Sequence, residues 1–238
     1  MVQSDHDFLF PYMTTFRIIT LFPESFESYL GASIIKRAIE DKKIAVKYYN
    51  PRDFALAGKK KAATYSERRV DNRPYGGGPG MVIEALPVIR AVEAALKGIK
   101  RKQKARIVFF NPAGKQFSNE VADTFKKYSD LILVCGRYEG IDARIKKAFP
   151  MADISVGPYV LTGGELPAMI LIDAITRRIP GVLGHDSSIE ESRIASPDVY
   201  TRPEVIEFKG KKYKVPKILL SGHHKNMEEW KKGRKHKQ

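Results

Sequence analysis

The sequence predicts an α/β protein in which a mostly parallel sheet is flanked by helices on both faces. Two observations indicate this class. Short apolar runs alternate with segments of helical periodicity from residue 16 to residue 179, which is the order of strands and crossover helices in a parallel sheet. Two of the runs, residues 107–110 (IVFF) and 131–135 (LILVC), are continuously apolar, as expected for strands that are buried on both sides.

The first half of the chain predicts two strands and two helices. Residues 16–22 (FRIITLF) form an apolar run, and residues 24–43 follow with an apolar side chain at every fourth position, which predicts a strand and then a helix. Residues 44–50 (IAVKYYN) predict the next strand. Residues 87–98 predict a helix that ends at Gly98, because glycine commonly follows the last helical turn.

The second half continues the alternation. Ser118 is the expected N-cap of a helix, because a serine hydroxyl accepts a hydrogen bond from an amide group of the first turn. The expected strands are 105–111, 130–136 and 152–157, and the expected helices are 118–128, 141–149 and 165–179.

The loops after three of these strands are the predicted binding region, because ligands of such sheets bind outside the carboxyl ends of the strands. Their sequences are FNPAG, CGRYEG and VGPYVLTGG, all rich in glycine or proline. The spacings G-x-x-x-x-G-K-[ST] and G-x-G-x-x-G are both absent, so neither standard nucleotide phosphate site is present.

Changes in composition and periodicity along the chain predict its domains. Residues 1–12 are expected to be an N-terminal extension, and residues 13–183 the sheet domain. Residues 184–200 are polar and aperiodic, which predicts a flexible linker. Residues 201–238 are rich in lysine and predict a small basic, mainly helical domain, with a helix around 226–232.

The charge balance indicates a polyanionic partner. The 238 residues carry a formal net charge of +15, with a pI near 9.7, which favours nucleic acid over an anionic membrane. We expect no membrane span, since no apolar run approaches the roughly 18 to 20 residues that spanning requires. The only cysteine, Cys135, excludes an internal disulfide, suits a reducing cytoplasm and is interpreted as a packing residue.

Several longer motifs resemble the bacterial tRNA (guanine-N1)-methyltransferases of the SPOUT superfamily. They are RPYGGGPGM, LVCGRYEGIDAR, ISVGPYVLTGGELPAMILIDAITRRIPGVLG, DVYTRPE and LLSGHH, in the same order as in that family. The resemblance implies a deep trefoil knot that binds S-adenosyl-L-methionine, and a homodimer with active sites at the subunit interface. It also implies methylation of N1 of guanosine 37 in tRNA and a role in tRNA binding for residues 201–238. Magnesium is implied as an assisting ion, whose ligands no sequence cluster identifies.

The resemblance also implies the cofactor site. In the family, backbone groups of three loops hold the adenine of the cofactor, and glycine suits such loops because no side chain blocks the approach. The matching positions are Asn111, Pro112, Gly136, Tyr138, Glu139, Gly140, Ile154, Ser155, Val156, Gly157, Tyr159, Leu161, Gly163, Gly164 and Pro167.

The implied reaction needs a base, because guanine N1 carries a proton at neutral pH. It also needs a cation, because negative charge builds on O6 as that proton leaves. The family arginine matches Arg177. The family base is a linker aspartate, and no aspartate stands at the matching place here. Glu191 is the predicted base, with Glu190, Asp186 and Asp198 as alternatives.

The expected substrate contacts are Asp71 and Arg73, beside the glycine-rich motif, together with Asp198 and Arg202. His223 and His224 lack the spacing of a zinc site, so no metal ligands are assigned. Two other functions stay open at this point. One is a knotted methyltransferase for ribose 2′-oxygen or ribosomal RNA, and the other is a non-catalytic RNA-binding protein that has lost its base.

Overall fold

The computed structural model describes residues 13–55, 68–99, 104–183 and 198–235. The chain divides into two compact units, residues 1–183 and residues 184–238.

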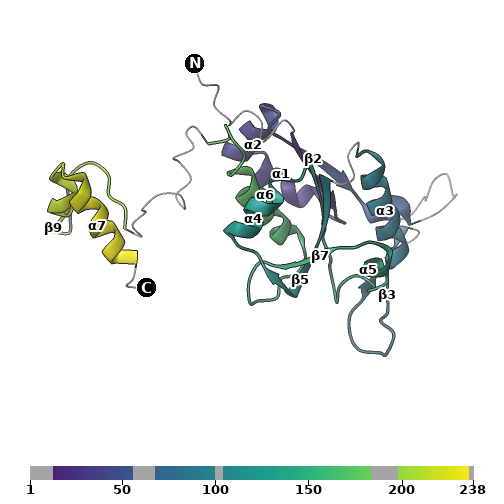
Figure 1. The fold of residues 1–238 in the computed structure, drawn as a ribbon. Coiled ribbons are helices and arrows are strands. Elements are labelled where there is room, and N and C mark those ends of the chain that lie inside the picture. The colour runs from purple at the N-terminus through teal and green to yellow at the C-terminus, as the bar shows by residue number, and fades with distance from the viewer. Residues whose placement is uncertain (1–12, 56–67, 100–103, 184–197, 236–238) are drawn as a thin grey trace, which may run out of the picture. The chain divides into compact units, whose positions relative to one another are not determined.

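A five-stranded sheet forms the centre of the first unit (Figure 1). Its order is β2-β1-β6-β5-β7, and every neighbouring pair is parallel. The strands are β1 (Thr14–Ile19), β2 (Ile44–Tyr49), β5 (Ala105–Gln116), β6 (Asp130–Val134) and β7 (Ala152–Ser155). All five lie where apolar runs predicted them, and the predicted fold class is confirmed.

Strand β5 is longer than expected. It continues beyond Asn111, and its register against β7 shifts between Phe110 and Lys115. Gly114 allows β5 to approach β7 closely here, because a Cβ at this position would lie 2.7 Å from the backbone nitrogen of Ile154. Residues 111–114 lie between the two paired parts of β5, and Pro112 and Ala113 are exposed.

Helices cover both faces of the sheet (Figure 1). One face carries α1 (Glu27–Leu30), α2 (Ser33–Glu40), α4 (Asn119–Phe125) and α6 (Glu165–Thr176), and its core includes Phe16, Leu133 and Leu171. The other carries α3 (Ala85–Lys97) and α5 (Ile145–Ala148), with a second core around Val92 and Ile132. Short 3₁₀ turns, η2 (Pro23–Phe26) and η3 (Pro51–Phe54), precede α1 and follow β2.

Two predicted helices are wrong in extent. The helix expected over 24–43 is broken into η2, α1 and α2, because Gly31 closes α1 by donating to the carbonyl of Glu27 and Ala32 is extended. The helix expected over 141–149 is reduced to α5. The first residues of the predicted helix pair with β4 instead. Ile141 forms a β-bridge with Ile83, and the amide of Asp142 donates to the carbonyl of Ile83.

Ser118 caps α4 as predicted, since its hydroxyl accepts a hydrogen bond from the amide of Val121. Helix α3 ends before Gly98, also as predicted.

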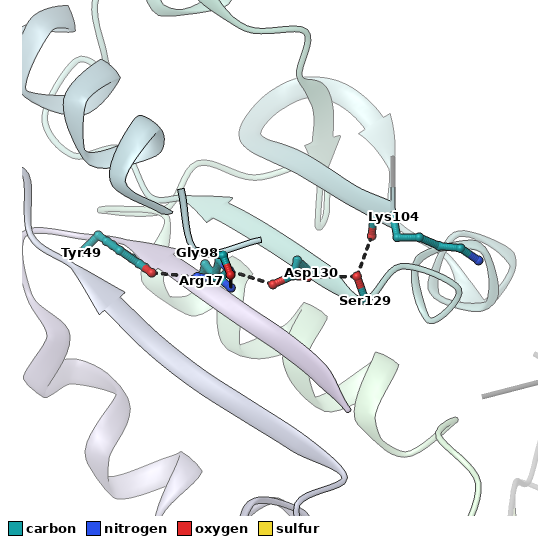
Figure 2. A network of polar contacts seen from close by, with 6 residues as sticks. All are labelled: Arg17, Tyr49, Gly98, Lys104, Ser129 and Asp130. Atoms are coloured by element: carbon teal, nitrogen blue, oxygen red, sulfur yellow. Dashed lines mark hydrogen bonds and ion pairs between the residues drawn. The ribbon is translucent and has the colours of Figure 1, made fainter. Parts of the chain in front are cut away.

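A buried ion pair holds the sheet together at the amino end of β6 (Figure 2). Arg17 Nε lies 2.7 Å from Asp130 Oδ1, and the same guanidinium donates to the hydroxyl of Tyr49 and to the carbonyl of Gly98. Ser129 donates to the second carboxylate oxygen of Asp130. A buried charge is tolerated when its partners satisfy it in this way. The pair ties β1, β2 and β6 to the end of α3.

The RPYGGGPGM motif connects the two strands of a small antiparallel sheet. Strands β3 (Asp71–Asn72) and β4 (Val82–Ile83) pair with each other and flank the glycines. Gly76, Gly77, Gly78 and Gly80 all have positive φ, a region that residues with a Cβ rarely adopt. The motif is therefore a loop that only glycine can follow at low cost.

The second unit contains a hairpin that the sequence-based prediction missed. Strands β8 (Val205–Phe208) and β9 (Lys211–Lys214) are antiparallel and joined by Lys209 and Gly210, both with positive φ, as in a type I′ turn. The short turn η8 (Lys217–Leu220) and helix α7 (His224–Lys235) follow. The helix predicted around 226–232 lies within α7.

Candidate active site

A cavity of about 440 Å³ opens at the carboxyl ends of β5, β6 and β7. The three loops that leave these strands form its wall, as the topology predicts for a parallel sheet. All fifteen positions assigned to a cofactor line this one cavity. Residues from three separate stretches of sequence are thus brought together, while their role in binding stays a prediction.

Bare backbone forms part of this wall because there is no room for side chains. A Cβ at Gly164 would lie 2.6 Å from the Cα of Cys135, and the amide of Gly164 donates to the carbonyl of Gly136. A Cβ at Gly163 would lie 2.5 Å from the Nε of Arg137. The glycines of the third loop are therefore required for its close contact with the second loop.

The turn at the end of β7 is fixed by its own side chains. The hydroxyl of Ser155 donates to the carbonyl of Gly157, and the hydroxyl of Tyr159 donates to the carbonyl of Val156. The Tyr159 ring lies so close to Gly157 that a Cβ there would be 2.3 Å from it. A side chain at position 157 would therefore displace the Tyr159 ring.

The second loop is joined to the RPYGGGPGM motif. The amide of Glu139 donates to the carbonyl of Met81, and the amide of Ile83 donates to the carbonyl of Gly140. Tyr138 and Gly140 both have positive φ. Two motifs that lie more than fifty residues apart in sequence therefore form one structure beside the cavity.

Arg137 and Glu165 form an ion pair at the cavity wall that the sequence-based prediction missed. Their Nε and Oε2 atoms lie 2.9 Å apart, without the angles of a hydrogen bond. Glu165 is buried and accepts a hydrogen bond from the hydroxyl of Thr20, while the guanidinium of Arg137 lies over the ring of Phe22. The motifs CGRYEG and TGGEL contain both residues, but their spacing gives no sign of the pairing.

Lys146 and Asp153 form a second ion pair that local sequence does not indicate. Lys146 Nζ lies 2.6 Å from Asp153 Oδ2 and over the ring of Phe109. Asn111 donates weakly to the same carboxylate at 3.4 Å. Lys146 also lines the cavity. The pair links α5 to β7 at the edge of the predicted cofactor site.

The two arginines at the end of α6 differ in their environments. Arg178 is 5% exposed, donates to the carbonyl of Ala174 and lies 3.7 Å from the carboxylate of Asp123 on α4. Arg177, the predicted catalytic residue, is the C-cap of α6 and is only half-buried. Arg178 therefore holds α6 against α4, whereas Arg177 has access to solvent.

The structure describes only some of the remaining predicted site residues. Glu191, Glu190 and Asp186 lie outside the described residues. Asp71 pairs with Arg69 at 3.4 Å, and Arg73 is exposed. Asp198 and Arg202 belong to the second unit.

Cys135 is buried in the core, as its apolar context predicts. Burial raises the pKa of its thiol well above the usual value, so the thiolate that would react is scarce at neutral pH.

Within the described part of the chain, no three or more His, Cys, Asp or Glu side chains are grouped so that they could hold a metal ion. In that same part, no helix is both long and apolar enough to span a bilayer.

Comparisons with known proteins all find tRNA (guanine-N1)-methyltransferases. The family model described as tRNA (Guanine-1)-methyltransferase TrmD matches residues 14–238. A tRNA (guanine-N(1)-)-methyltransferase of Alkaliphilus oremlandii is 42% identical over 223 residues, covering 91% of this chain and 85% of that protein. The protein of the same description from Clostridioides difficile is 42% identical over 221 residues, covering 91% and 90%.

A solved structure is also similar. The crystal structure of tRNA (m1G37) methyltransferase from Aquifex aeolicus superposes with a TM-score of 0.72 at 34% identity, covering 93% of this chain and 89% of that one.

Proposed function

Because the chain belongs to the tRNA (guanine-N1)-methyltransferase family of the SPOUT superfamily, we propose that it methylates N1 of guanosine 37 in tRNA, with S-adenosyl-L-methionine as methyl donor. The observation that carries this proposal is the single cavity lined by all fifteen predicted cofactor positions. The description of the similar Aquifex aeolicus structure as a tRNA (m1G37) methyltransferase supports position 37 as the target.

The cavity suits the proposed cofactor. Its volume of about 440 Å³ falls in the range of small-molecule sites, and its glycine backbone offers amide and carbonyl groups that a Cβ would cover. Residues 136–140 and 161–164 would hold the adenine. Glu139, the only acid among the fifteen positions, would face the ribose or the sulfonium. When bound, the cofactor supplies an electrophilic methyl group on sulfur and is left as a neutral thioether.

The chain supplies the base and the cation that guanine requires. Glu191 would accept the proton of N1 as the new bond to carbon forms, which keeps the electron pair of N1 available for that bond. Arg177 would donate to O6 and stabilise the negative charge that develops there. The half-buried position of Arg177 at the end of α6 is compatible with contact to a substrate.

The same proposal includes a homodimer with the active sites at the subunit interface. Leu166 and Ile170 on α6 are 55% and 41% exposed, and they line an apolar groove together with Tyr29 and Met169. Pro167 on the same helix lines the cofactor cavity. A second copy that covered this groove would bury exposed apolar area and would lie beside the cavity.

The likeness of the motifs further supports a trefoil knot around the cofactor and a cytoplasmic location. The family likewise implies magnesium as an assisting ion.

Methyl transfer to two tRNA transcripts tests the proposed function. One transcript has guanosine at position 37 and the other has adenosine, and a labelled methyl donor reports incorporation. The proposal expects incorporation into the guanosine transcript alone. No incorporation into either transcript would leave a non-catalytic RNA-binding protein, and equal incorporation into both would exclude position 37.

A further inference from the structure

Three charged side chains stand among the described residues that line the cavity, namely Arg137, Glu139 and Lys146. Arg137 is paired with the buried carboxylate of Glu165, at 2.9 Å. Lys146 is paired with Asp153, which is not part of the cavity wall. The side chain of Lys146 is 36% exposed, against 25% for that of Arg137. The Lys146 ammonium is therefore the more accessible of the two cations.

Two contacts hold the Lys146 ammonium at the wall. Its Nζ atom lies 4.5 Å from the centre of the Phe109 ring and donates a hydrogen bond of 2.6 Å to Asp153 Oδ2. An ammonium group has three N–H donors, and this bond uses one of them. A cation held in this way suits an anionic ligand, because little side-chain freedom is lost when the ligand binds.

Asn111 brings a second donor to the same place. Its side-chain carbonyl accepts a hydrogen bond of 3.0 Å from the amide of Ala113, while its Nδ2 atom faces Asp153. This Nδ2 atom lies 3.4 Å from the same Oδ2 atom that Lys146 contacts. Both donors thus lie around one carboxylate oxygen, and their spacing fits a carboxylate.

The proposed cofactor has a carboxylate that needs such donors. S-adenosyl-L-methionine ends in an α-amino acid group with one carboxylate and one ammonium. Moving a carboxylate from water into a cavity is costly unless a donor or a cation replaces the water. The adenine is assigned to residues 136–140 and 161–164, which leaves the part of the cavity lined by Phe109, Asn111 and Lys146 for the amino acid end.

We propose that Lys146 binds the α-carboxylate of the cofactor, with Asn111 as a second donor. A hydrogen bond between an ammonium and a carboxylate is stronger than one between neutral groups, so Lys146 favours ligands that carry the carboxylate. This inference rests on S-adenosyl-L-methionine being the methyl donor under the proposed function. It adds to that function a binding residue outside the fifteen predicted positions.

Isothermal titration calorimetry with two ligands tests the contact. S-adenosyl-L-methionine and its decarboxylated form differ only in the α-carboxylate. The substitution Lys146→Met removes the charge and keeps an unbranched side chain beside the Phe109 ring. We expect it to raise the Kd for S-adenosyl-L-methionine about tenfold, but not the Kd for the decarboxylated form. An equal rise for both ligands, or no rise for either, would overturn the contact.

Lys147→Met is the matched control. It makes the same change of charge at the next position of α5, which does not line the cavity. We expect both Kd values to stay unchanged in this variant. A rise for S-adenosyl-L-methionine equal to that in Lys146→Met would assign the effect to net charge and overturn the contact.

A double variant separates lost attraction from new repulsion. Lys146→Met also removes the ion pair of Asp153, and the carboxylate left behind would repel that of the cofactor. In Lys146→Met/Asp153→Asn we expect the Kd for S-adenosyl-L-methionine to stay raised. Recovery of the unaltered value would show that repulsion was the cause, and Lys146 would then bind no carboxylate.

The contact and the proposed function fail in different ways. An unaltered chain that binds neither ligand would refute the proposed cofactor together with the contact. A chain that methylates guanosine 37, and whose Lys146→Met variant binds both ligands as before, would refute the contact alone. If that variant binds both ligands as before but has a raised Kd for tRNA, the contact is also refuted and Lys146 is assigned to a phosphate of the tRNA.

Discussion

Glu139 lies directly against Gly80, so that a Cβ at position 80 would be 2.6 Å from the carboxylate oxygen Oε1 of Glu139. This contact joins the RPYGGGPGM loop to the second loop of the cofactor cavity, next to the hydrogen bond from the amide of Glu139 to Met81. The first motif therefore shapes the proposed cofactor site without lining it.

The substitution Gly80→Ala should weaken cofactor binding by displacing the Glu139 side chain. We expect the Kd for S-adenosylmethionine, measured by isothermal titration calorimetry, to rise about tenfold, equivalent to about 1.4 kcal/mol. The matched control is Gly77→Ala, because Gly77 has φ of +79 against +85 for Gly80 but nothing within 4 Å of its Cβ position. Both variants share the backbone strain. Equal losses in the two would assign the effect to strain alone.

Substitution of the two arginines at the end of α6 should have different effects, on catalysis for Arg177 and on stability for Arg178. We expect Arg177→Ala to lower kcat about 100-fold or more, as loss of a donor to a developing anion does. Arg178→Ala should instead lower the free energy of unfolding by about 1–3 kcal/mol, because it removes the hydrogen bond to Ala174. Single-turnover kinetics and thermal unfolding of both variants provide the check. A near-normal rate in Arg177→Ala would show that Arg177 has no catalytic role.

Glu191→Gln should remove the proposed base while keeping the size of the side chain. We expect the rate of methyl transfer to fall about 100-fold to 10,000-fold, with the Kd for S-adenosylmethionine unchanged. Glu190→Gln and Asp198→Asn serve as controls with the same loss of charge. A larger loss in either control would move the base to that position.

The exposed side of α6 should mediate self-association. Ile170→Asp places a charge in the apolar groove between α6 and the Tyr29 region, so we expect sedimentation velocity to show a dimer in the unaltered chain and a monomer in the variant. Leu86→Asp is the control, since Leu86 is 53% exposed on α3 at the opposite face of the sheet. Dissociation by Leu86→Asp, or a dimer that survives Ile170→Asp, contradicts this interface.

The groove also contains a polar contact. Tyr29 donates to Asp173 at 2.5 Å, and this hydrogen bond raises the pKa of Tyr29 to about 12. Because the folded-state pKa lies above the unfolded value, the contact stabilises the fold fully below about pH 10 and loses this effect as pH rises through about 12. The contact is therefore intact throughout the neutral range.

The sheet and the cavity were predictable because their signals are local. Continuous apolar runs mark strands such as β6, and glycine at positions 157, 163 and 164 marks backbone that approaches other atoms closely. The pairings Arg137 with Glu165 and Lys146 with Asp153 were not predictable. Each joins residues from different loops or elements, and nothing in the spacing of two charges indicates that they meet.

The hairpin was missed for a different reason. The lysines of β9 hide the alternation of side chains, since three of its four residues are lysine. The dipeptide Lys209–Gly210 was the available signal, because glycine between two β-prone runs favours a tight turn. The break in the helix expected over residues 24–43 was also indicated in the sequence, by Gly31. The regular apolar spacing on both sides of Gly31 favoured one continuous helix instead.

The identity of the modified nucleoside decides whether the chain methylates N1 of guanosine 37. A tRNA transcript with guanosine at position 37 is incubated with the chain and S-adenosylmethionine, digested to nucleosides and analysed by mass spectrometry against standards. We expect 1-methylguanosine, in an oligonucleotide that contains position 37. A 2′-O-methylated nucleoside, a methyl group on another atom of guanine or an unmodified tRNA would contradict it.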